Sequence, residues 1–393
     1  MTDGSAPRWS PRNAPDGLLA AAFLGMLGTA GMFYVNLLPA IVSGLRDALG
    51  YSNAQAGYVA SANVYGAALG ALAAVFIVRR FAWKRVQAAA LVLLIALDLA
   101  SMTVASLPLL VALRGLHGIC GGVSIGIALA VMARTRVPQR AYGAQFTLQV
   151  LLGGLGLLWL PELAARLGSW VLFLSLAVVA AITLALLPLL ADYPPGSARG
   201  VHAAARIPRW PLAATLAAIF LFQAANMGLF AFIIPLGRHY ALGTGFISNT
   251  LAVADWVAAA GSLLAMWAGL RFGRARPLGI ALLVSIPATA LFLSSDVPYL
   301  FAAANVVTGI AWSFVIPWLF SMCAALDPTG RSATLGGFCS KMGLASGPLL
   351  APYLIGNEDF PQLIRVSAAT LAVVLVAASW PARTLDRPAG LAS

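Results

Sequence analysis

The chain has 393 residues, of which 61% are hydrophobic and only 9% are charged, and its mean hydropathy is +0.90. Soluble globular domains carry about 25% charged residues, so this composition excludes a soluble enzyme, a disordered chain and a nucleic-acid-binding protein. In so apolar a chain, the net charge of +12 indicates membrane topology before it indicates an anionic partner.

Apolar runs recur along the chain, and a helix needs about 20 apolar residues to cross a bilayer. The first run has 27 residues, too long for the apolar part of a cleavable signal peptide. We therefore interpret it as the first membrane span. Twelve spans are predicted, at 17–43, 54–78, 86–106, 109–133, 141–161, 170–190, 210–237, 246–270, 277–295, 298–325, 332–355 and 361–381.

The basic residues in the loops predict the orientation. Eighteen of the 24 Lys and Arg residues fall on the side of the N-terminus, four fall on the opposite side, and two lie within spans. Because cytoplasmic loops carry the excess of Lys and Arg, both termini are expected in the cytoplasm. We expect an integral protein of the bacterial cytoplasmic (inner) membrane, with the lipid bilayer as its surroundings and no nucleic-acid partner.

The two halves of the sequence form an internal repeat with an offset of 191 residues. The offset superposes Gly70 on Gly261, Arg80-Phe81 on Arg271-Phe272, Gly118-Ile119 on Gly309-Ile310, Arg140 on Arg331 and Gly156 on Gly347. Two parallel six-helix repeats with a solute site between them are typical of transporters. The predicted division is a tail at 1–16, a six-helix bundle at 17–190, a linker at 191–209, a second bundle at 210–381 and a tail at 382–393.

Two loops at equivalent places in the repeat carry basic motifs, RRFAWKR at 79–85 and RFGRAR at 271–276. With them the chain resembles the major facilitator superfamily over essentially its whole length. The resemblance implies an all-α membrane protein with twelve transmembrane helices in two pseudo-symmetric six-helix bundles. It also implies gating loops that contain Arg80, Arg85, Arg271, Gly273 and Arg274. The acidic residue of the family signature, which helps to lock the cytoplasmic gate, is replaced here by Arg79 and Leu270.

Two further family motifs concern proton coupling. Span 4 reads RGLHGICGG from Arg114, similar to a family motif whose arginine is associated with proton coupling. The motif G-x-x-x-G-P-x-x-G-G of proton antiporters is absent from span 5, and a partial copy, GLASGPLLAP, occurs at 343–352 in span 11. This displacement weakens the interpretation of the chain as a drug-efflux protein.

Five titratable residues are predicted within the hydrocarbon: Asp98, Arg114, His117, Asp255 and Lys341. Each costs about 3 kcal/mol at the bilayer centre unless it has a partner or a wet cavity. Asp98 and Arg114 lie roughly 14 Å and 10 Å from the outer surface on neighbouring spans, so they can meet. They form either a fixed ion pair or a pair in which Asp98 competes with a proton or solute for Arg114. His117 is either a hydrogen-bonded packing residue or a coupling residue.

Asp255 and Lys341 are both predicted near mid-depth, in spans 8 and 11, which flank the central cavity in the family. They form either a structural pair or an ion pair that opens during transport. We favour the second interpretation, in which Lys341 holds an anionic group of the solute and Asp255 takes the coupled proton.

Polar and aromatic residues in the cavity-lining spans complete the candidate solute site. A single aromatic residue in a membrane helix is more often packed or lipid-facing, but the set favours an amphipathic or aromatic solute over a sugar. Pro39 and Pro235, near the outer ends of spans 1 and 7, are either hinges for the rocking of the bundles or kinks that only shape their helices. The additional candidates for solute binding are Tyr34, Asn36, Tyr65, Gln223, Asn226, Trp256, Asn305 and Trp312.

The sequence therefore predicts a secondary active transporter that moves a small organic solute by alternating access. We expect coupling to protons, with Na⁺ as the other possible ion, a monomer, and neither a cofactor nor a metal. The favoured solute is an organic anion or an aromatic or amphipathic metabolite. The alternatives are a drug–proton or metabolite–proton antiporter and a non-transporting sensor with the same fold. An intramembrane enzyme is not expected, because the sequence contains no H-E-x-x-H motif.

Overall fold

The computed structural model describes residues 14–193, 209–268, 271–327, 331–356 and 359–386. All regular elements within these residues are helical. The first half contains α1 (Leu18–Asn36), α2 (Leu38–Leu49), α3 (Asn53–Arg80), α4 (Trp83–Ser101), α5 (Leu107–Met132), α6 (Pro138–Leu167), α7 (Trp170–Leu186) and a short 3₁₀ helix (Leu187–Leu189). The second half contains α8 (Arg209–Ala231), α9 (Ile233–His239), α10 (Thr244–Ala268), α11 (Ala275–Ala290), a second 3₁₀ helix (Leu291–Ser294), α12 (Pro298–Leu326), α13 (Arg331–Ile355) and α14 (Phe360–Asp386).

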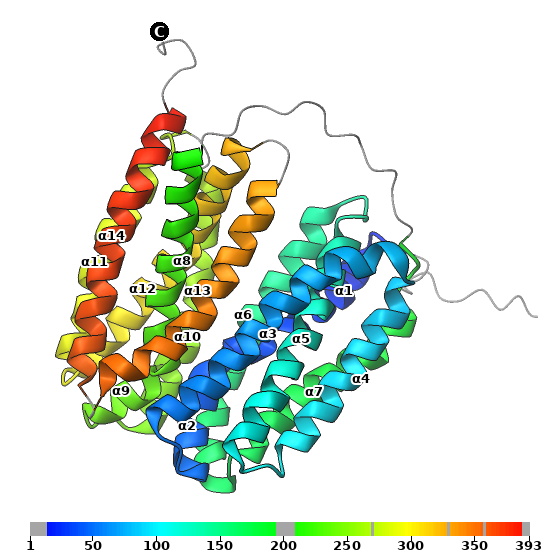
Figure 1. Cartoon of the computed structure of the whole chain (residues 1–393), viewed down its shortest axis with the longest axis horizontal. Helices are drawn as coiled ribbons and strands as arrows, with labels where there is room; N and C mark the ends of the chain where they lie inside the picture. Colours follow the sequence, from blue (N-terminus) through cyan, green and yellow to red (C-terminus); the bar gives the residue numbers. More distant parts are fainter. Residues whose placement is uncertain (1–13, 194–208, 269–270, 328–330, 357–358, 387–393) are drawn as a thin grey trace, which may run out of the picture.

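The helices form two bundles that stand side by side, α1–α7 in the N-bundle and α8–α14 in the C-bundle (Figure 1). The bundles lie closest together around α2 and α9, and they splay apart towards the end of the molecule where α8 begins. We call these two ends the far end and the linker end. The sequence analysis correctly predicted an all-helical fold built from two halves.

The first span of each half is broken into two helices, which the hydropathy pattern did not predict. The breaks fall at Leu37, between α1 and α2, and at Phe232, between α8 and α9. Pro39 and Pro235 follow these breaks within the first turn of the next helix. Proline has no N–H group and its ring crowds the carbonyl four residues earlier, so each proline favours a break just before it. Their role as hinges stays a prediction.

Ten helices of the described residues are long and apolar enough to cross a membrane by themselves. The two others among the twelve predicted spans are α4 and α13, which are more polar. Helix α4 carries Lys84, Arg85 and Asp98 within 19 residues, and α13 carries Lys341. Both helices pack against neighbouring helices, α4 against α5 and α7, and α13 against α8 and α3.

Buried apolar side chains gather into three cores. One core lies at the far end and takes residues from both bundles, such as Phe33 and Leu38 in the N-bundle and Phe232 and Leu236 in the C-bundle. A second core contains only N-bundle residues, and a third contains only C-bundle residues. The two bundles therefore share one hydrophobic core at the far end and have separate cores towards the linker end.

Glycines allow α3 and α5 to pack in direct backbone contact. A Cβ atom at Gly118 would overlap the carbonyl oxygen of Asn63, and one at Gly66 would overlap the carbonyl oxygen of Gly115. Glycine stripes permit such close approach between membrane helices. The glycines of span 4 thus act in helix packing.

Several predicted segments lie mostly outside the described residues, namely the two tails and the linker. Residues 1–13, 194–208 and 387–393 are not described, nor are the side chain of Arg79 and residue Leu270. The last helix continues to Asp386, five residues beyond the predicted end of its span.

Candidate transport site

Polar contacts tie the two bundles together at and near the far end. Asp47 on α2 forms an ion pair with Arg238 on α9, which the sequence analysis did not predict. The hydroxyl groups of Tyr58 and Tyr353 lie 2.8 Å apart. These contacts join elements that are far apart in the sequence and close the space between the bundles at this end.

Tyr65, a predicted solute-binding residue, makes a further bridge between the bundles. Its hydroxyl group lies 2.8 Å from the Oγ atom of Ser346 on α13. Along the same pair of helices, a Cβ atom at Gly57 would overlap the carbonyl oxygen of Pro348. Helices α3 and α13 therefore meet directly, and Tyr65 is engaged in that contact.

A second contact between the bundles joins α6 to α10. Trp256, a predicted solute-binding residue, places its indole ring in the notch at Gly154, where a Cβ atom would overlap its Nε1 atom. The Nε1 atom donates to the carbonyl oxygen of Leu151 at 3.4 Å. Two glycines in succession, Gly153 and Gly154, leave the space that this contact requires.

Asp255 lies at the same contact and faces the N-bundle. A Cβ atom at Gly153 would lie 2.8 Å from its Oδ2 atom and 3.0 Å from Nδ2 of Asn36. Asn36 Nδ2 donates to the backbone carbonyl oxygen of Gln149 at 2.9 Å, and Gln149 Nε2 donates to Asn36 Oδ1 at 3.2 Å. The Oδ2 atom of Asp255 is buried and has no hydrogen-bond partner among the described residues. A carboxylate thus lies between the bundles without a cation beside it.

Lys341 is half-buried on α13, and it has neither an ion pair nor a hydrogen bond within the described part of the chain. One turn earlier, Gly337 has no atom of the described residues within 4 Å of the place where a Cβ atom would lie. Residues four apart share one face of a helix. Lys341 therefore lies on a face of α13 that is open around Gly337.

A hydrogen-bonded group joins three helices of the C-bundle beside Lys341. Gln223 donates through Nε2 to Oγ of Ser340 at 2.7 Å, and its Oε1 atom accepts from Nε1 of Trp312 at 2.7 Å. Gln223 and Trp312 were predicted, whereas Ser340 was not. A single serine in an apolar helix gives no sequence signal that separates it from a packing residue.

The expected ion pair between Asp255 and Lys341 does not form among the described residues, because neither side chain has an ionic partner within 4.0 Å. Asp255 lies against α6 and α1. Lys341 comes directly after Ser340, whose hydroxyl group accepts a hydrogen bond from Gln223 of α8. The two residues therefore lie in different contacts of the molecule. Each is an isolated charge in the arrangement seen here.

Asp98 and Arg114 form the predicted ion pair, with Nη1 of Arg114 2.7 Å from Oδ1 of Asp98. Both side chains are fully buried inside the N-bundle. The guanidinium group also donates to the Leu97 carbonyl oxygen at 2.8 Å and to Ser101 Oγ at 2.6 Å, and it lies 4.9 Å from the ring of Phe173. Arg114 is thus surrounded by its own bundle and offers no free surface to a solute in this arrangement.

His117 completes this buried group. Asn63 donates through its amide nitrogen to the Arg114 carbonyl oxygen at 3.1 Å, which fixes the orientation of the amide, and the same nitrogen lies 2.8 Å from Nδ1 of His117. Nδ1 therefore accepts a hydrogen bond, and Nε2–H points to Asp98 Oδ1 at 3.2 Å. His117 is held as a neutral ring between Asn63 and Asp98. Asn63 was missed because it lies in the glycine-rich packing face of α3.

Three other predicted solute-binding residues have partners within their own bundle. Tyr34 is buried beside His117, with ring centroids 5.9 Å apart. Asn226 and Asn305 each donate to a carbonyl oxygen of their own helix at 2.8 Å. Asn305 is the repeat equivalent of Arg114. Its side chain bonds to the carbonyl oxygen of Phe301 in its own helix, whereas Arg114 bonds to an acidic residue of the neighbouring helix.

The predicted gating loops contact their own bundles. Lys84 forms an ion pair with Asp192 at 2.9 Å, beyond the last helix of the N-bundle. In the C-bundle, Asp386 of α14 accepts from the backbone N–H groups of Arg274 and Ala275 at 2.8 Å. Gly273 has a φ of +70°, which favours glycine, and its absent side chain leaves room for Asp386. The side chains of Arg80, Arg85 and Arg271 are exposed.

These features match a known family along most of the chain. The model of the Major Facilitator Superfamily matches residues 18–352. The chain belongs to the major facilitator superfamily. It is accordingly an integral membrane transporter, and its two bundles are the two halves typical of this superfamily. No curated protein sequence matches the chain significantly.

Solved structures of the superfamily share this fold at low sequence identity. A point mutant of the nucleoside transporter NupG covers 93% of this chain and 99% of its own, with 14% identity and a TM-score of 0.77. The D-xylose-proton symporter covers 93% and 96%, with 15% identity and a TM-score of 0.72. A bacterial homologue of the human lysosomal transporter Spinster, in an inward-facing and unoccupied conformation, covers 95% and 98%, with 16% identity and a TM-score of 0.68. At these identities the likeness concerns the fold alone.

Proposed function

We propose that this protein is a proton-coupled secondary transporter in which Asp255 carries the proton and Lys341 binds an anionic group of the solute. One observation carries the proposal. Asp255 and Lys341 are ionisable side chains within the bundles, and neither has an ionic partner among the described residues. A charge in a membrane helix requires a partner or water, so both residues need access to a wet path between the bundles.

The position of Asp255 supports its coupling role. Its carboxylate lies at the contact between α6 and α10, and this contact has to separate when the far end opens. While the contact is closed, the neutral carboxylic acid is favoured, since burial disfavours a charge without a partner. Opening of the far end would expose the same group to water and favour the charged form. Opening and closing of the far end are thereby linked to the release and uptake of one proton.

The buried group of Asp98, Arg114 and His117 has a different role in this proposal. Its members contact one another inside a single bundle, so it holds α4 against α5. The solute then contacts Lys341 together with Gln223 and Trp312, which are hydrogen-bonded to each other and, through Gln223, to the adjacent Ser340. A cation with an amide and an indole suits an organic anion that carries an aromatic or amphipathic part.

We further propose that the linker end faces the cytoplasm of a bacterial cell, so that both termini are cytoplasmic and the structure is inward-facing. The exposed arginines Arg80, Arg85 and Arg271 all lie at this end, as the distribution of positive charge in membrane proteins requires. The shared core and the polar bridges close the far end, and the Spinster homologue with the same fold is also inward-facing.

Transport by reconstituted protein tests the coupling role. The probes are benzoate, uridine, D-xylose and tetraphenylphosphonium in proteoliposomes with an imposed pH gradient. For a probe that is transported, Asp255→Asn should retain exchange of solute against solute and lose accumulation driven by the gradient. Glu162→Gln, an exposed carboxylate paired with Arg166, should behave as wild type. Accumulation that survives in Asp255→Asn would remove this residue from the coupling mechanism.

The role of Lys341 is tested by thermal stabilisation of the purified protein with the same four probes. Benzoate should stabilise the wild type and lose this effect in Lys341→Gln, whereas the unfolding temperature without ligand should change little. Stabilisation by tetraphenylphosphonium in both proteins would favour the alternative function, the efflux of amphipathic compounds. Benzoate stabilisation that persists in Lys341→Gln would remove this residue from the site.

A further inference from the structure

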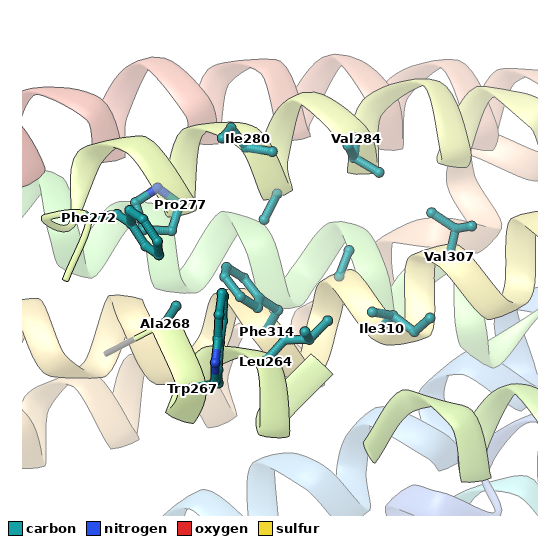
Figure 2. Close-up of a pocket in the computed structure, with 12 residues that line it drawn as sticks. Leu264, Trp267, Ala268, Phe272, Pro277, Ile280, Val284, Val307, Ile310 and Phe314 are labelled. Atoms are coloured by element: carbon teal, nitrogen blue, oxygen red, sulfur yellow. The ribbon is translucent and has the colours of Figure 1, made fainter. Parts of the chain in front are cut away.

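An open groove with a volume of about 340 Å³ lies on the surface of the C-bundle between α10, α11 and α12. Figure 2 shows side chains of α11, among them Pro277 and Ile280, facing Trp267 and Phe314 across it. Its lining is apolar throughout, and Trp267 and Ile280 are more than 60% exposed. The groove therefore opens outwards from the bundle, away from the contact with the N-bundle.

The chemistry of the groove does not suit a transported solute. Binding sites for small polar molecules combine apolar walls with a few polar groups that fix the orientation of the ligand. The walls here offer aliphatic carbons and aromatic rings, such as Leu264, Ile310 and Val284. On the membrane-facing side of a transporter, a groove of this kind is matched by a hydrocarbon chain.

Two arginines flank the linker end of the groove. Arg271 precedes Phe272 and Arg276 precedes Pro277, and both Phe272 and Pro277 line the groove. Both arginines are exposed and have no ionic partner among the described residues. Arg274, which lies between them, instead approaches Asp386, with Nη1 3.9 Å from Oδ1. Two free positive charges therefore lie beside the end of an apolar groove.

The two halves of the molecule differ in the glycines of these helices. In the N-bundle, glycines at 66, 118, 122 and 126 bring α3 and α5 together, and a Cβ atom at Gly126 would overlap that of Ala74. Three of the four equivalent positions in the C-bundle are occupied by Val257, Ser313 and Pro317. The glycine stripe of the N-bundle is therefore interrupted at these three positions of the C-bundle.

We propose that this groove holds an acyl chain of an anionic phospholipid whose phosphate is bound by Arg271 and Arg276. Guanidinium groups bind phosphate oxygens through paired, charge-assisted hydrogen bonds. Basic sites at the ends of membrane helices bind anionic lipid headgroups. The exposed rings of Trp267 and Phe272, whose centroids lie 6.1 Å apart, lie where the acyl chain meets the headgroup. The site needs neither Asp255 nor Lys341.

Native mass spectrometry of the full-length protein in detergent tests this site with dioleoyl phosphatidylglycerol and dioleoyl phosphatidylcholine as probes. Phosphatidylglycerol should bind more tightly than phosphatidylcholine. The double variant Arg271→Gln/Arg276→Gln should lose about 25-fold in affinity for phosphatidylglycerol, because each basic residue beside an anionic headgroup contributes about fivefold. The double variant with Lys at both positions should retain most of the preference. Val284→Trp, which fills the groove from its exposed wall, should weaken the binding of both lipids.

The repeat-equivalent arginines provide the matched control. Arg80→Gln/Arg85→Gln removes two exposed arginines from the equivalent loop of the N-bundle and should leave the affinity for phosphatidylglycerol unchanged. Equal affinity of the wild type for the two lipids would overturn the proposal, as would unchanged binding in the double Gln variant. Tight binding of glycerol phosphate, which has no acyl chain, would show a site for free phosphate instead. A dimer that Val284→Trp dissociates would show that a second copy of the chain occupies the groove.

Discussion

Arg238 and Asp47 form an ion pair across the two bundles, with Nη1 2.5 Å from Oδ2 at the far end. The pair joins α9 to α2, the short helices that follow the breaks at Phe232 and Leu37. Because each partner belongs to a different half of the molecule, this contact exists only while the far end is closed. The presence of this ion pair therefore distinguishes the conformation with a closed far end from the conformation with an open one.

Asp47→Asn is expected to shift the population towards the open far end. The two side chains are 41% and 29% exposed, and exposed pairs contribute up to about 1 kcal/mol. The ratio of the two conformations should therefore change by up to about fivefold. Spin labels at positions 48 and 299, with the native cysteines replaced by serine, would report the distance across the far end. The charge-reversed double variant Asp47→Arg/Arg238→Asp should restore the wild-type distribution, and a distribution unchanged in Asp47→Asn would contradict the role of the pair.

Arg114→Met is expected to destabilise the protein strongly, because it leaves the buried carboxylate of Asp98 without its cation. Breaking a buried pair in this way costs about 3–5 kcal/mol, whereas replacing both partners with apolar residues costs much less. The double variant Asp98→Leu/Arg114→Met should therefore be more stable than Arg114→Met alone. Thermal unfolding in detergent would measure this order. A double variant less stable than Arg114→Met would show that the pair is more than a structural contact.

Gly118→Ala is expected to disturb the N-bundle, since a Cβ atom there would overlap the carbonyl oxygen of Asn63. Overpacking of this kind costs about 1–3 kcal/mol, and the contact is with rigid backbone. Gly143→Ala is the control, because nothing lies within 4 Å of the added atom. The monodisperse fraction in size-exclusion chromatography should fall for the first variant only. Equal behaviour of the two variants would contradict the direct packing of α3 on α5.

Gly154→Leu is expected to hold the far end open, because the added side chain occupies the notch that receives Trp256. The N-bundle itself should be unaffected, so the variant should fold and its spin-label distances across the far end should increase. Trp256→Ala in the same chain removes the obstructing ring and should restore part of the closed population. A wild-type distance distribution in Gly154→Leu would show that the contact between α6 and α10 tolerates a larger side chain.

The sequence was sufficient to predict which residues meet only where a tight turn fixed two helices side by side. Asp98 and Arg114 lie on consecutive helices joined by a short loop, so their depths alone predicted the ion pair. Asp255 and Lys341 lie on helices that are not consecutive. Depth gives one coordinate of such residues and leaves open the direction in which each side chain points, so their separation was not predictable.

Contacts between the bundles could not be predicted from the sequence either, because they depend on the conformation of the molecule. Tyr65 was expected to contact solute, yet its hydroxyl group bridges to Ser346. Asp386, in the predicted C-terminal tail, accepts hydrogen bonds from the backbone N–H groups of Arg274 and Ala275, next to Gly273. Proline positions did indicate the breaks in the first span of each half, although hydropathy alone merged the two helices.

The shared hydrophobic core at the far end has a consequence for assembly from fragments. Because α1, α2, α8 and α9 all contribute side chains to it, the two bundles adhere to each other through buried surface as well as through the peptide that connects them. Two separately synthesised halves, divided between residues 193 and 209, would each contain a complete inner core. Each would also expose half of the shared core, which is a complementary surface for association within the bilayer.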